Sequence, residues 1–321
     1  MGRQPCNLHS RGLTLLAMRS TFHWRLRDRQ LELGPRTLVM SIVNVTPDSF
    51  SDGGRYLSAD AAVQYALTML DEGADIIDIG GESTRPGSRV SGDDPTAARP
   101  VVSEDEELRR VLPVIEGVLA GRPEAIISVD TYKAAVARRA VASGAQIVND
   151  VSGLRWDADM ASALAELGCG VVLMQMRGRP AEWRTLPPLE NGVELVSREL
   201  RGIAETALRA GIARDRIVLD PGLGFGKSFD ENYPLIDRFG EFQKLGFPLL
   251  AGPSRKSFIG YTLRTNGAEA PPDQRLYGTL AATTVVILNG AHIVRVHDVR
   301  PAVEAARVAD AVVRSRHSVA R

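Results

Sequence analysis

The sequence LVMSIVNVTPDSFSDGG, residues 38–54, contains the unit that decides the fold. Its first part, Leu38 to Val43, is a continuous apolar run that predicts a buried β-strand. Polar and turn-forming residues follow from Asn44 to Gly54, and an amphipathic helical pattern begins near Ala59. This loop is longer than the median connection in a compact domain. The stretch therefore predicts a strand, a polar loop that can carry function, and a helix.

The same strand–loop–helix unit occurs eight times along the chain. The strands are predominantly apolar, as in Ile76–Ile79 and Ile217–Leu219, which is typical of parallel strands covered on both faces. Eight units across about 280 residues predict a single (β/α)8 TIM barrel, with a doubly wound open sheet as the alternative. Strands are expected at 38–43, 75–79, 125–129, 146–149, 170–174, 216–219, 248–252 and 293–296, and helices at 59–73, 104–119, 132–143, 159–167, 193–210, 232–245, 276–289 and 300–314.

The two ends of the chain do not follow this unit. Residues 21–33 alternate apolar and polar side chains around Asp28 and Arg29, which predicts a short N-terminal β-hairpin. Residues 1–20 contain three arginines and no acidic residue, so we expect a disordered N-terminal extension. A mitochondrial transit peptide and a true start at Met18 are the alternatives. One domain is predicted at 21–315, with a tail at 316–321.

Composition excludes several classes of protein. The 321 residues are 44% hydrophobic and 24% charged, so the chain can bury a core. The net charge of zero argues against nucleic acid or a membrane surface as the main partner. Cys6 and Cys169 are the only cysteines and lack metal-ligand spacing, which favours a cytoplasmic location. No apolar run is long enough for a transmembrane helix.

Polar residues stand at the end of every predicted strand. Because the carboxyl ends of barrel strands meet on one face, these side chains are expected to form a ring around one pocket. Any one of them could instead cap a helix, which is the usual role of Asp, Asn, Ser or Thr there. The polar strand-end residues are Asn44, Asp78, Glu82, Ser83, Thr84, Arg85, Asp130, Thr131, Asn149, Asp150, Gln175, Asp220, Ser254, Arg255, Lys256, Arg295 and His297.

The glycine-rich segment Gly222–Ser228 looks like a phosphate-binding loop but does not match either common pattern. A Walker loop needs glycine where Pro221 stands, and a dinucleotide fingerprint needs glycine where Lys227 stands. We interpret its glycines as letting the backbone pass close to a flat ligand, with Phe225 over that ligand.

Seven motifs of the chain occur in the order of one known family. They are residues 44–54, 80–87, 128–133, 149–153, 219–227, 254–257 and 295–299. Across about 22–315 the chain closely resembles the dihydropteroate synthase family. The resemblance implies a TIM barrel and a homodimer that sulfonamides inhibit. It also implies a Mg²⁺-dependent condensation of 6-hydroxymethyl-7,8-dihydropterin diphosphate with p-aminobenzoate, giving 7,8-dihydropteroate and pyrophosphate in folate biosynthesis.

The resemblance also implies roles for individual residues. The aminopyrimidinone edge of a pterin offers N–H donors and one carbonyl, which suit carboxylates and a cation. The pterin site would contain Asp130, Asn149, Val151, Val172, Met174, Asp220, Phe225, Gly252 and Lys256. The diphosphate would bind Asn44, Arg295 and His297, with Asn44 next to the Mg²⁺. The p-aminobenzoate site and its closing loops would use Phe50, Asp52, Thr84, Arg85, Pro86 and Ser254, and the catalytic residues would be Lys256, Asp130, Asp220, Arg295 and His297.

Two features depart from the family pattern. Gln175 stands where the family commonly has histidine, and the segment Val90–Val101 is longer than the usual link. They leave open a pterin-binding relative with little or no turnover. A methyltetrahydrofolate–corrinoid methyltransferase is a second alternative, although it has no need of Arg295 and His297. In the synthase reading, loss of diphosphate leaves a carbocation, and the neutral aniline nitrogen attacks without a general base.

Overall fold

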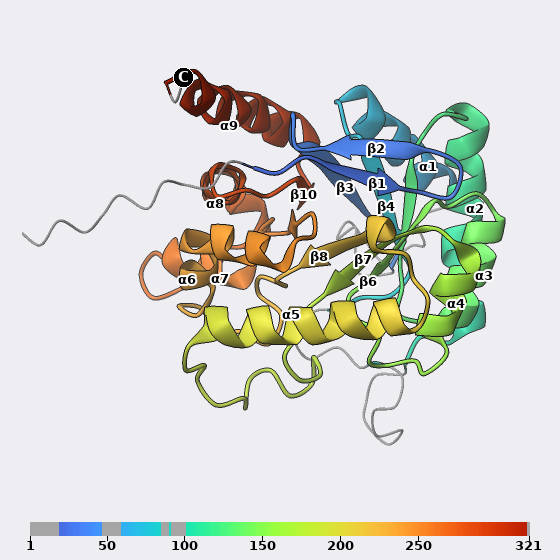
Figure 1. The fold of residues 1–321 in the computed structure, drawn as a ribbon, viewed down its shortest axis with the longest axis horizontal. Coiled ribbons are helices and arrows are strands. Elements are labelled where there is room, and N and C mark those ends of the chain that lie inside the picture. The colour runs from blue at the N-terminus through green and yellow to red at the C-terminus, as the bar shows by residue number, and fades with distance from the viewer. Residues whose placement is uncertain (1–18, 47–58, 85–89, 91–100, 320–321) are drawn as a thin grey trace, which may run out of the picture.

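The computed structural model describes residues 19–46, 59–84, 90 and 101–319, and in these residues helices surround a ring of parallel strands (Figure 1). The sheet runs in the order β8-β7-β6-β5-β4-β3-β10-β9. A parallel bridge between Leu219 and Leu249 joins its two outer strands, so the ring closes and the barrel is confirmed over the open sheet. The strands are β3 Leu38–Asn44, β4 Ile76–Gly80, β5 Ile127–Asp130, β6 Ile147–Asp150, β7 Gly170–Met174, β8 Ile217–Asp220, β9 Leu250–Ala251 and β10 Ile293–Val296.

The helices follow the predicted positions with three differences, the first being that the last helix ends at Val319 and not at 314. The segment expected as one helix at 232–245 is divided into helix α6 and a 3-10 helix, Phe239–Leu245, in which Phe239 and Phe242 are both buried at three-residue spacing. Helix α7 was not predicted because it has only six residues, too few for a periodic pattern. The α-helices are α1 Ala59–Asp71, α2 Glu104–Gly121, α3 Ala134–Ala142, α4 Met160–Leu167, α5 Gly192–Arg209, α6 Asn232–Asp237, α7 Ser257–Thr262, α8 Leu276–Leu288 and α9 Val299–Val319.

The predicted N-terminal hairpin is confirmed and closes one end of the barrel. Strand β1, Phe22–Arg25, pairs antiparallel with β2, Gln30–Leu33. Trp24 and Leu33 pack against the apolar side chains that point into the barrel, and the Trp24 Nε1–H donates to the Arg216 carbonyl at 2.8 Å. The inward-facing apolar layer comprises Leu38, Met40, Ile76, Ile147, Val172, Val218, Leu250 and Ile293.

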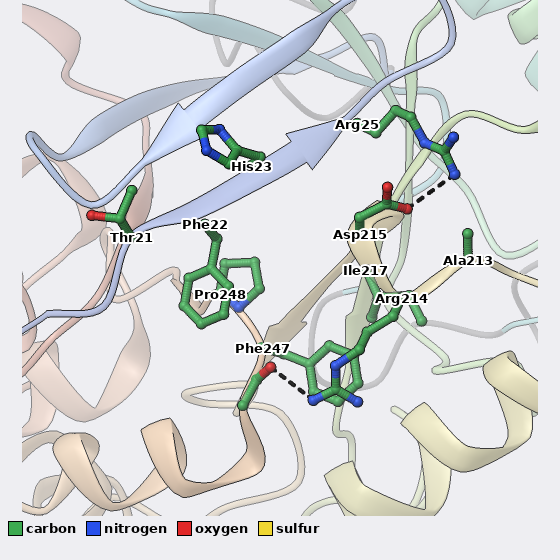
Figure 2. A pocket seen from close by; sticks show the side chains of 11 residues that line it. Thr21, Phe22, His23, Arg25, Ala213, Arg214, Asp215, Ile217, Phe247 and Pro248 are labelled. Atoms are coloured by element: carbon green, nitrogen blue, oxygen red, sulfur yellow. Dashed lines mark hydrogen bonds and ion pairs between the residues drawn. The ribbon is translucent and has the colours of Figure 1, made fainter.

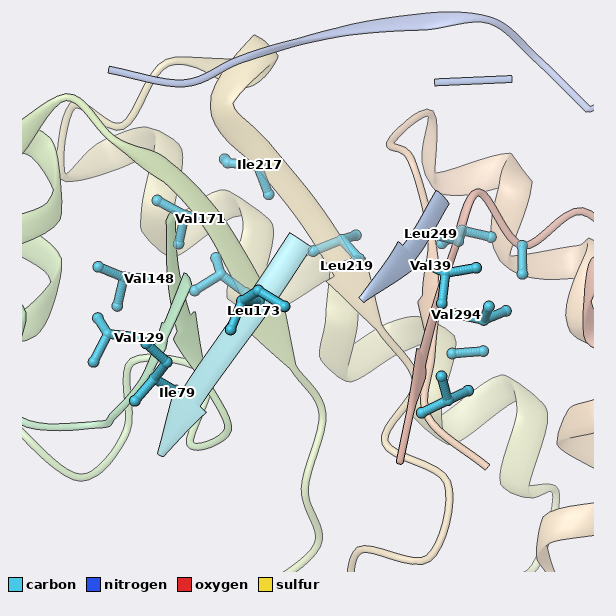
Figure 3. Close-up of a cluster of buried hydrophobic side chains, with 14 of the residues drawn as sticks. Val39, Ile79, Val129, Val148, Val171, Leu173, Ile217, Leu219, Leu249 and Val294 are labelled. Carbon is cyan, nitrogen blue, oxygen red and sulfur yellow. The ribbon is translucent and has the colours of Figure 1, made fainter. Parts of the chain in front are cut away.

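A second apolar cluster fills the space between the strands and the surrounding helices. Successive side chains of a strand point to opposite faces of the sheet, and those that alternate with the inward-facing positions, such as Val129 and Leu173, point outward into this layer (Figure 3). This alternation decides whether a residue meets the helices or the barrel interior. In the interior, the hairpin and the apolar layer occupy the amino-terminal half, which leaves the carboxyl ends of the strands for polar side chains.

Arg19 lies inside the fold, although the predicted extension included it. Its guanidinium donates to the Gly34 carbonyl at 2.8 Å and forms a buried ion pair of 2.9 Å with Asp310 of helix α9. Residues 1–18 lie outside the described residues, so the extension itself stays a prediction. No helix in the described ranges is long and apolar enough to cross a membrane, and the cytoplasmic location stays a prediction too.

Candidate active site

The strand register brings the predicted polar residues to one level of the barrel. Asn44 pairs with Gly80, Gly80 with Asp130, and Asp130 with Asn149. All four have inward parity, so three polar side chains surround a glycine that contributes none. A Cβ at Gly80 would lie 3.4 Å from the Asp130 Cβ and 3.7 Å from the Asn44 Oδ1. Asn44 and Asp130 therefore lie on either side of Gly80, each within van der Waals reach of a side chain at that position.

Asp78, which the sequence placed at a strand end without a specific role, connects Asn149 to Arg295. Its Oδ2 accepts hydrogen bonds from Arg295 Nε at 2.6 Å and from Asn149 Nδ2 at 3.0 Å. Arg295 Nη2 also donates to Asp130 Oδ2 at 2.7 Å. Asp78 is fully buried, and its Oδ1 has no hydrogen-bond partner among the described residues. Its position in the strand could have revealed this role. Ile76 and Gly80 face the barrel interior, and Asp78 stands midway between them, so its side chain must face the interior as well.

The pKa values of Asp130 and Arg295 depend on the charges around them. Burial raises the pKa of Asp130, while the nearby Arg295 guanidinium acts against that rise. Burial alone would lower the pKa of Arg295, but Asp78 and Asp130 raise it above its ordinary value. Arg295 is therefore a permanent cation between two carboxylates at the mouth of the barrel.

Asp220 and Lys256 form the opposite side of the site. Asp220 Oδ1 accepts the Gly222 N–H at 2.7 Å, and burial raises the pKa of Asp220 to about 6. Burial lowers the pKa of Lys256 to about 7, and its Nζ lies 3.6 Å from the centre of the Phe225 ring. A cation at this distance over an aromatic face is attracted to it. Lys256 therefore lies beside both Phe225 and Asp220.

The glycines of the loop 222–226 face protein, which differs from the interpretation made from sequence. Gly222 and Gly226 both have φ of +67°. A Cβ on either one would overlap a backbone carbonyl oxygen, that of Gln175 or that of Arg177 respectively. The glycines let this loop pass close to the segment after β7, rather than close to a ligand.

Lys227 holds the same loop from inside. Its buried ammonium donates to the carbonyl oxygens of Gly222 at 2.7 Å and Phe225 at 3.2 Å. Burial lowers the pKa of Lys227 to about 7. The loop geometry, and with it the place of the Phe225 ring, depends on this lysine.

The expected apolar wall is present in part as one cluster. Val151 and Met174 pack together with Met176, and Phe225 packs against them. Val172 belongs instead to the inward apolar layer beneath, in register with Asn149. A Cβ at Gly252 would lie 3.8 Å from the Arg295 Cβ, an ordinary van der Waals distance. Contact with Arg295 therefore does not require glycine at position 252.

His297 and Ser254 connect two strand ends. The Ser254 hydroxyl and His297 Nδ1 are hydrogen-bonded at 3.0 Å, and the His297 backbone N–H donates to the same hydroxyl at 3.1 Å. Thr84 is half-buried at the end of the described part of its loop. The other predicted residues of the closing loops, Phe50, Asp52, Arg85 and Pro86, lie outside the described residues.

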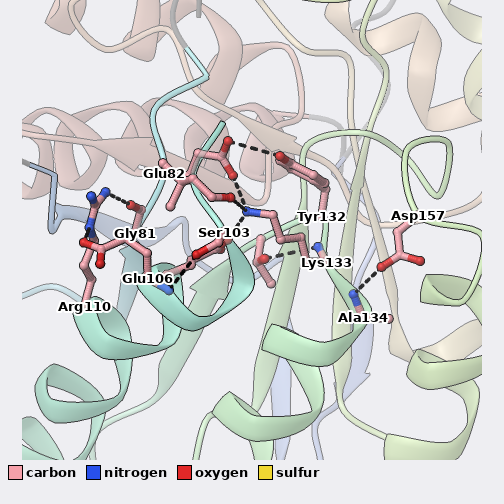
Figure 4. Close-up of polar contacts among 12 residues, drawn as sticks. Gly81, Glu82, Ser103, Glu106, Arg110, Tyr132, Lys133, Ala134 and Asp157 are labelled. Atoms are coloured by element: carbon pink, nitrogen blue, oxygen red, sulfur yellow. Dashed lines mark hydrogen bonds and ion pairs between the residues drawn. The ribbon is translucent and has the colours of Figure 1, made fainter. Parts of the chain in front are cut away.

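The segment that leads into the second loop is anchored by a buried ion cluster (Figure 4). Lys133 Nζ lies 2.6 Å from a carboxylate oxygen of Glu82 and 2.6 Å from one of Glu107. The Tyr132 hydroxyl donates to the second Glu82 oxygen at 3.1 Å. Burial raises the pKa of Glu82, and Lys133 acts against it. Lys133, one of four lysines in the chain, thus secures a loop root and does not line the site.

Gln175 points away from the site. It is fully buried, and its Nε2 donates to Glu199 of helix α5 at 2.8 Å. Its backbone N–H donates to the Asp220 carbonyl at 2.8 Å. The departure from the family pattern therefore lies behind the polar ring, on the helix side of β7.

A hollow of about 540 Å³ lies at the hairpin end of the barrel and contains none of the predicted site residues (Figure 2). Phe22 and Phe247 line it, together with Arg25, which pairs with Asp215 at 3.1 Å. Among the described residues no group of three or more His, Cys, Asp or Glu side chains could hold a metal.

Comparisons with known proteins identify relatives of this chain. The family model described as pterin binding enzyme matches residues 40–297. The dihydropteroate synthase of Escherichia coli K12 is 44% identical over 280 residues, which cover 87% of this chain and 93% of that protein. The solved Yersinia pestis dihydropteroate synthase with a sulfonamide drug is 42% identical, with a TM-score of 0.81 over 92% of this chain and 99% of that one. The Xanthomonas albilineans enzyme with 4-aminobenzoic acid is 43% identical, with a TM-score of 0.80 over 91% and 98%.

Proposed function

The chain belongs to the dihydropteroate synthase family, and from that membership we propose how its residues divide the reaction. The protein is a transferase that joins a dihydropterin diphosphate to p-aminobenzoate and releases pyrophosphate. The observation that carries the proposal is the polar ring, in which Asp130 and Asn149 lie in register and Lys256 interacts electrostatically with Asp130 and Asp220.

We assign the pterin to the space between the two carboxylates and Lys256. Asp130, Asn149 and Asp220 would accept from or donate to the nitrogens of the ring, and Lys256 would donate to its carbonyl. Met174 and Phe225 form the apolar wall against which a flat ring can pack. Burial makes these charge-assisted hydrogen bonds stronger than they would be in water.

We assign the diphosphate to Arg295 and His297. The C–O bond to the diphosphate breaks, and its electron pair leaves with the diphosphate, whose charge Arg295 neutralises. The electron-rich dihydropterin stabilises the resulting carbocation. The neutral aniline nitrogen of p-aminobenzoate then forms the C–N bond and loses a proton to solvent. No general base is needed for this attack.

We propose Mg²⁺ as the cofactor, with Asn44 as its protein ligand. Mg²⁺ commonly takes one or two protein oxygens and completes its shell with water and substrate phosphates. The half-buried Asn44 amide, close to Asp130 across Gly80, fits such a site. The ion would supply further neutralisation of the leaving diphosphate.

A direct assay tests this function. Purified protein, dihydropterin diphosphate, p-aminobenzoate and Mg²⁺ are expected to yield pyrophosphate and dihydropteroate in equal amounts. Pterin binding without either product would favour the relative without turnover, which the sequence left open. The place of Gln175 on the helix side of β7 gives that alternative no support.

The pH dependence of kcat/KM for the dihydropterin diphosphate should be bell-shaped. Activity is expected to fall below about pH 7 to 6, where first Asp130 and then Asp220 gain a proton, and above about pH 7, where Lys256 loses one. In Lys256→Arg the alkaline limb should move to higher pH, because a guanidinium stays charged. An alkaline limb that is unchanged in this variant would assign it to another group.

The first loop is predicted to close over p-aminobenzoate with Asp52. We expect Asp52→Ala to raise KM for p-aminobenzoate about tenfold, the effect of losing one charge-assisted contact, while leaving pterin binding unchanged. Steady-state kinetics with each substrate varied in turn measure this. An unchanged KM would remove Asp52 from loop closure.

We propose that the protein is a homodimer. Helices α8 and α9 pack side by side and expose apolar residues on both surfaces, among them Tyr277 and Val285 on α8 and Val308 and Val312 on α9. Light scattering is expected to give twice the chain mass for the parent protein, and Val308→Arg should shift it toward the monomer. A monomeric parent would refute the proposal.

A further inference from the structure

The turn between β9 and α7 carries two assigned site residues on either side of Arg255. Arg255 has a φ of +55°, in the left-handed region that residues with a Cβ rarely adopt. The Lys256 N–H donates to the Pro253 carbonyl at 3.3 Å, so Arg255 is the third residue of a β-turn. Glycine is the usual residue at this turn position when φ is positive. An arginine there needs support from its surroundings.

Three contacts from distant segments supply this support. The Arg255 N–H donates to Thr279 Oγ1 at 3.0 Å, and its carbonyl accepts from Arg275 Nη1 at 2.9 Å. Its guanidinium makes a two-pronged ion pair with Asp298, Nε to Oδ2 at 3.0 Å and Nη2 to Oδ1 at 2.5 Å. The backbone and the side chain of this one residue are therefore all held in place.

The ion pair also joins the turn to the diphosphate side of the site. Asp298 directly follows His297, and His297 is hydrogen-bonded to Ser254. The two strand ends are thus connected twice, by Ser254 to His297 and by Arg255 to Asp298. A change in the second connection must alter the turn that leads to Ser254 and Lys256.

We propose that Asp298 is a positioning residue for the reaction. Its ion pair keeps Arg255 in the left-handed conformation, and that conformation directs Ser254 toward His297 and Lys256 toward Phe225. This inference rests on the substrate roles assigned to Ser254 and Lys256 above. It extends them to a residue that touches neither substrate.

A double-mutant cycle between positions 298 and 255 tests the proposal. Asp298→Asn is expected to lower kcat/KM for both substrates by about 10- to 100-fold, the effect of a small misplacement of site residues. Arg255→Gly removes the strain, because glycine adopts positive φ freely. In the Arg255→Gly background, Asp298→Asn should therefore change kcat/KM by no more than about twofold. An equal loss in both backgrounds, or no loss in either, would overturn the proposal.

One further variant and one control complete this experiment. Arg255→Lys retains the Cβ and its strain but cannot make both hydrogen bonds, so it should itself lose about 10- to 100-fold in kcat/KM. This variant tests the ion pair independently if Asp298→Asn does not fold. Asp75→Asn is the matched control, because Asp75 accepts both Arg36 nitrogens, at 2.9 and 2.6 Å, at the other end of the barrel. It should leave both KM values unchanged.

Failure of the substrate assignments can be told apart from failure of the positioning role. If Ser254→Ala and Lys256→Ala have parental kinetics, the assigned site is wrong. If those variants are impaired while Asp298→Asn behaves like the parent protein, only the role of Asp298 is refuted.

Discussion

Replacing Lys256 with alanine is expected to abolish measurable pterin binding. The variant loses a charge-assisted hydrogen bond and the attraction between Nζ and the Phe225 ring, together about 3–4 kcal/mol, or roughly 10²- to 10³-fold in Kd. Titration calorimetry with the dihydropterin measures this loss. Asp220→Ala should have a similar effect, because it removes the carboxylate on the same side of the site.

Lys244→Ala provides the control for this experiment. Lys244 is an exposed lysine on the 3-10 helix after α6, so its removal should change neither binding nor melting temperature. Thermal melting of Lys256→Ala separates lost binding from lost folding. Parental affinity in Lys256→Ala or in Asp220→Ala would show that the pterin lies elsewhere.

Replacing Arg295 with methionine should damage both folding and turnover. The change leaves Asp78 and Asp130 without their shared cation in a buried setting, which should lower the free energy of unfolding by about 3–5 kcal/mol. Because Arg295 is also assigned to the leaving diphosphate, kcat should fall by about 10²- to 10³-fold. Denaturant unfolding and steady-state kinetics measure the two effects.

A second substitution distinguishes these effects. Adding Asp78→Asn to Arg295→Met removes one unpaired carboxylate, while an asparagine oxygen can still accept from Asn149. Part of the lost stability is expected to return, but turnover is not. If kcat recovered with stability, Arg295 would act only as a structural cation.

Local patterns in the sequence were sufficient for the barrel and for the identity of most site residues. Period-2 and period-3.6 patterns depend on neighbouring residues, so all eight strands and the hairpin were found close to their observed bounds. The strand β9 was expected at 248–252 but spans only Leu250–Ala251. A strand ends where its backbone hydrogen-bond partners on the neighbouring strands end, and the composition of the strand does not reveal that point. The helix expected at 232–245 divides for a comparable reason, because Phe239 and Phe242 are buried against the barrel.

Tertiary structure alone decided which side chains act on one another. Asp78 and Arg295 are 217 residues apart, and only the closed register of β4, β3 and β10 places their side chains at 2.6 Å. The glycines at 222 and 226 suggested a ligand contact, yet their space is taken by the segment after β7, an approach no local pattern encodes.

The sequence by itself therefore determined the barrel, the family and the ring of polar strand ends. These follow from short-range periodicity and from motifs a few residues long. The tertiary structure decided that Asp78 joins Asn149 to Arg295, and that Asp298 holds Arg255 in a left-handed turn. These pairs lie 43 to 217 positions apart, and they meet because the strands that carry them, or that lead to them, are aligned in one barrel.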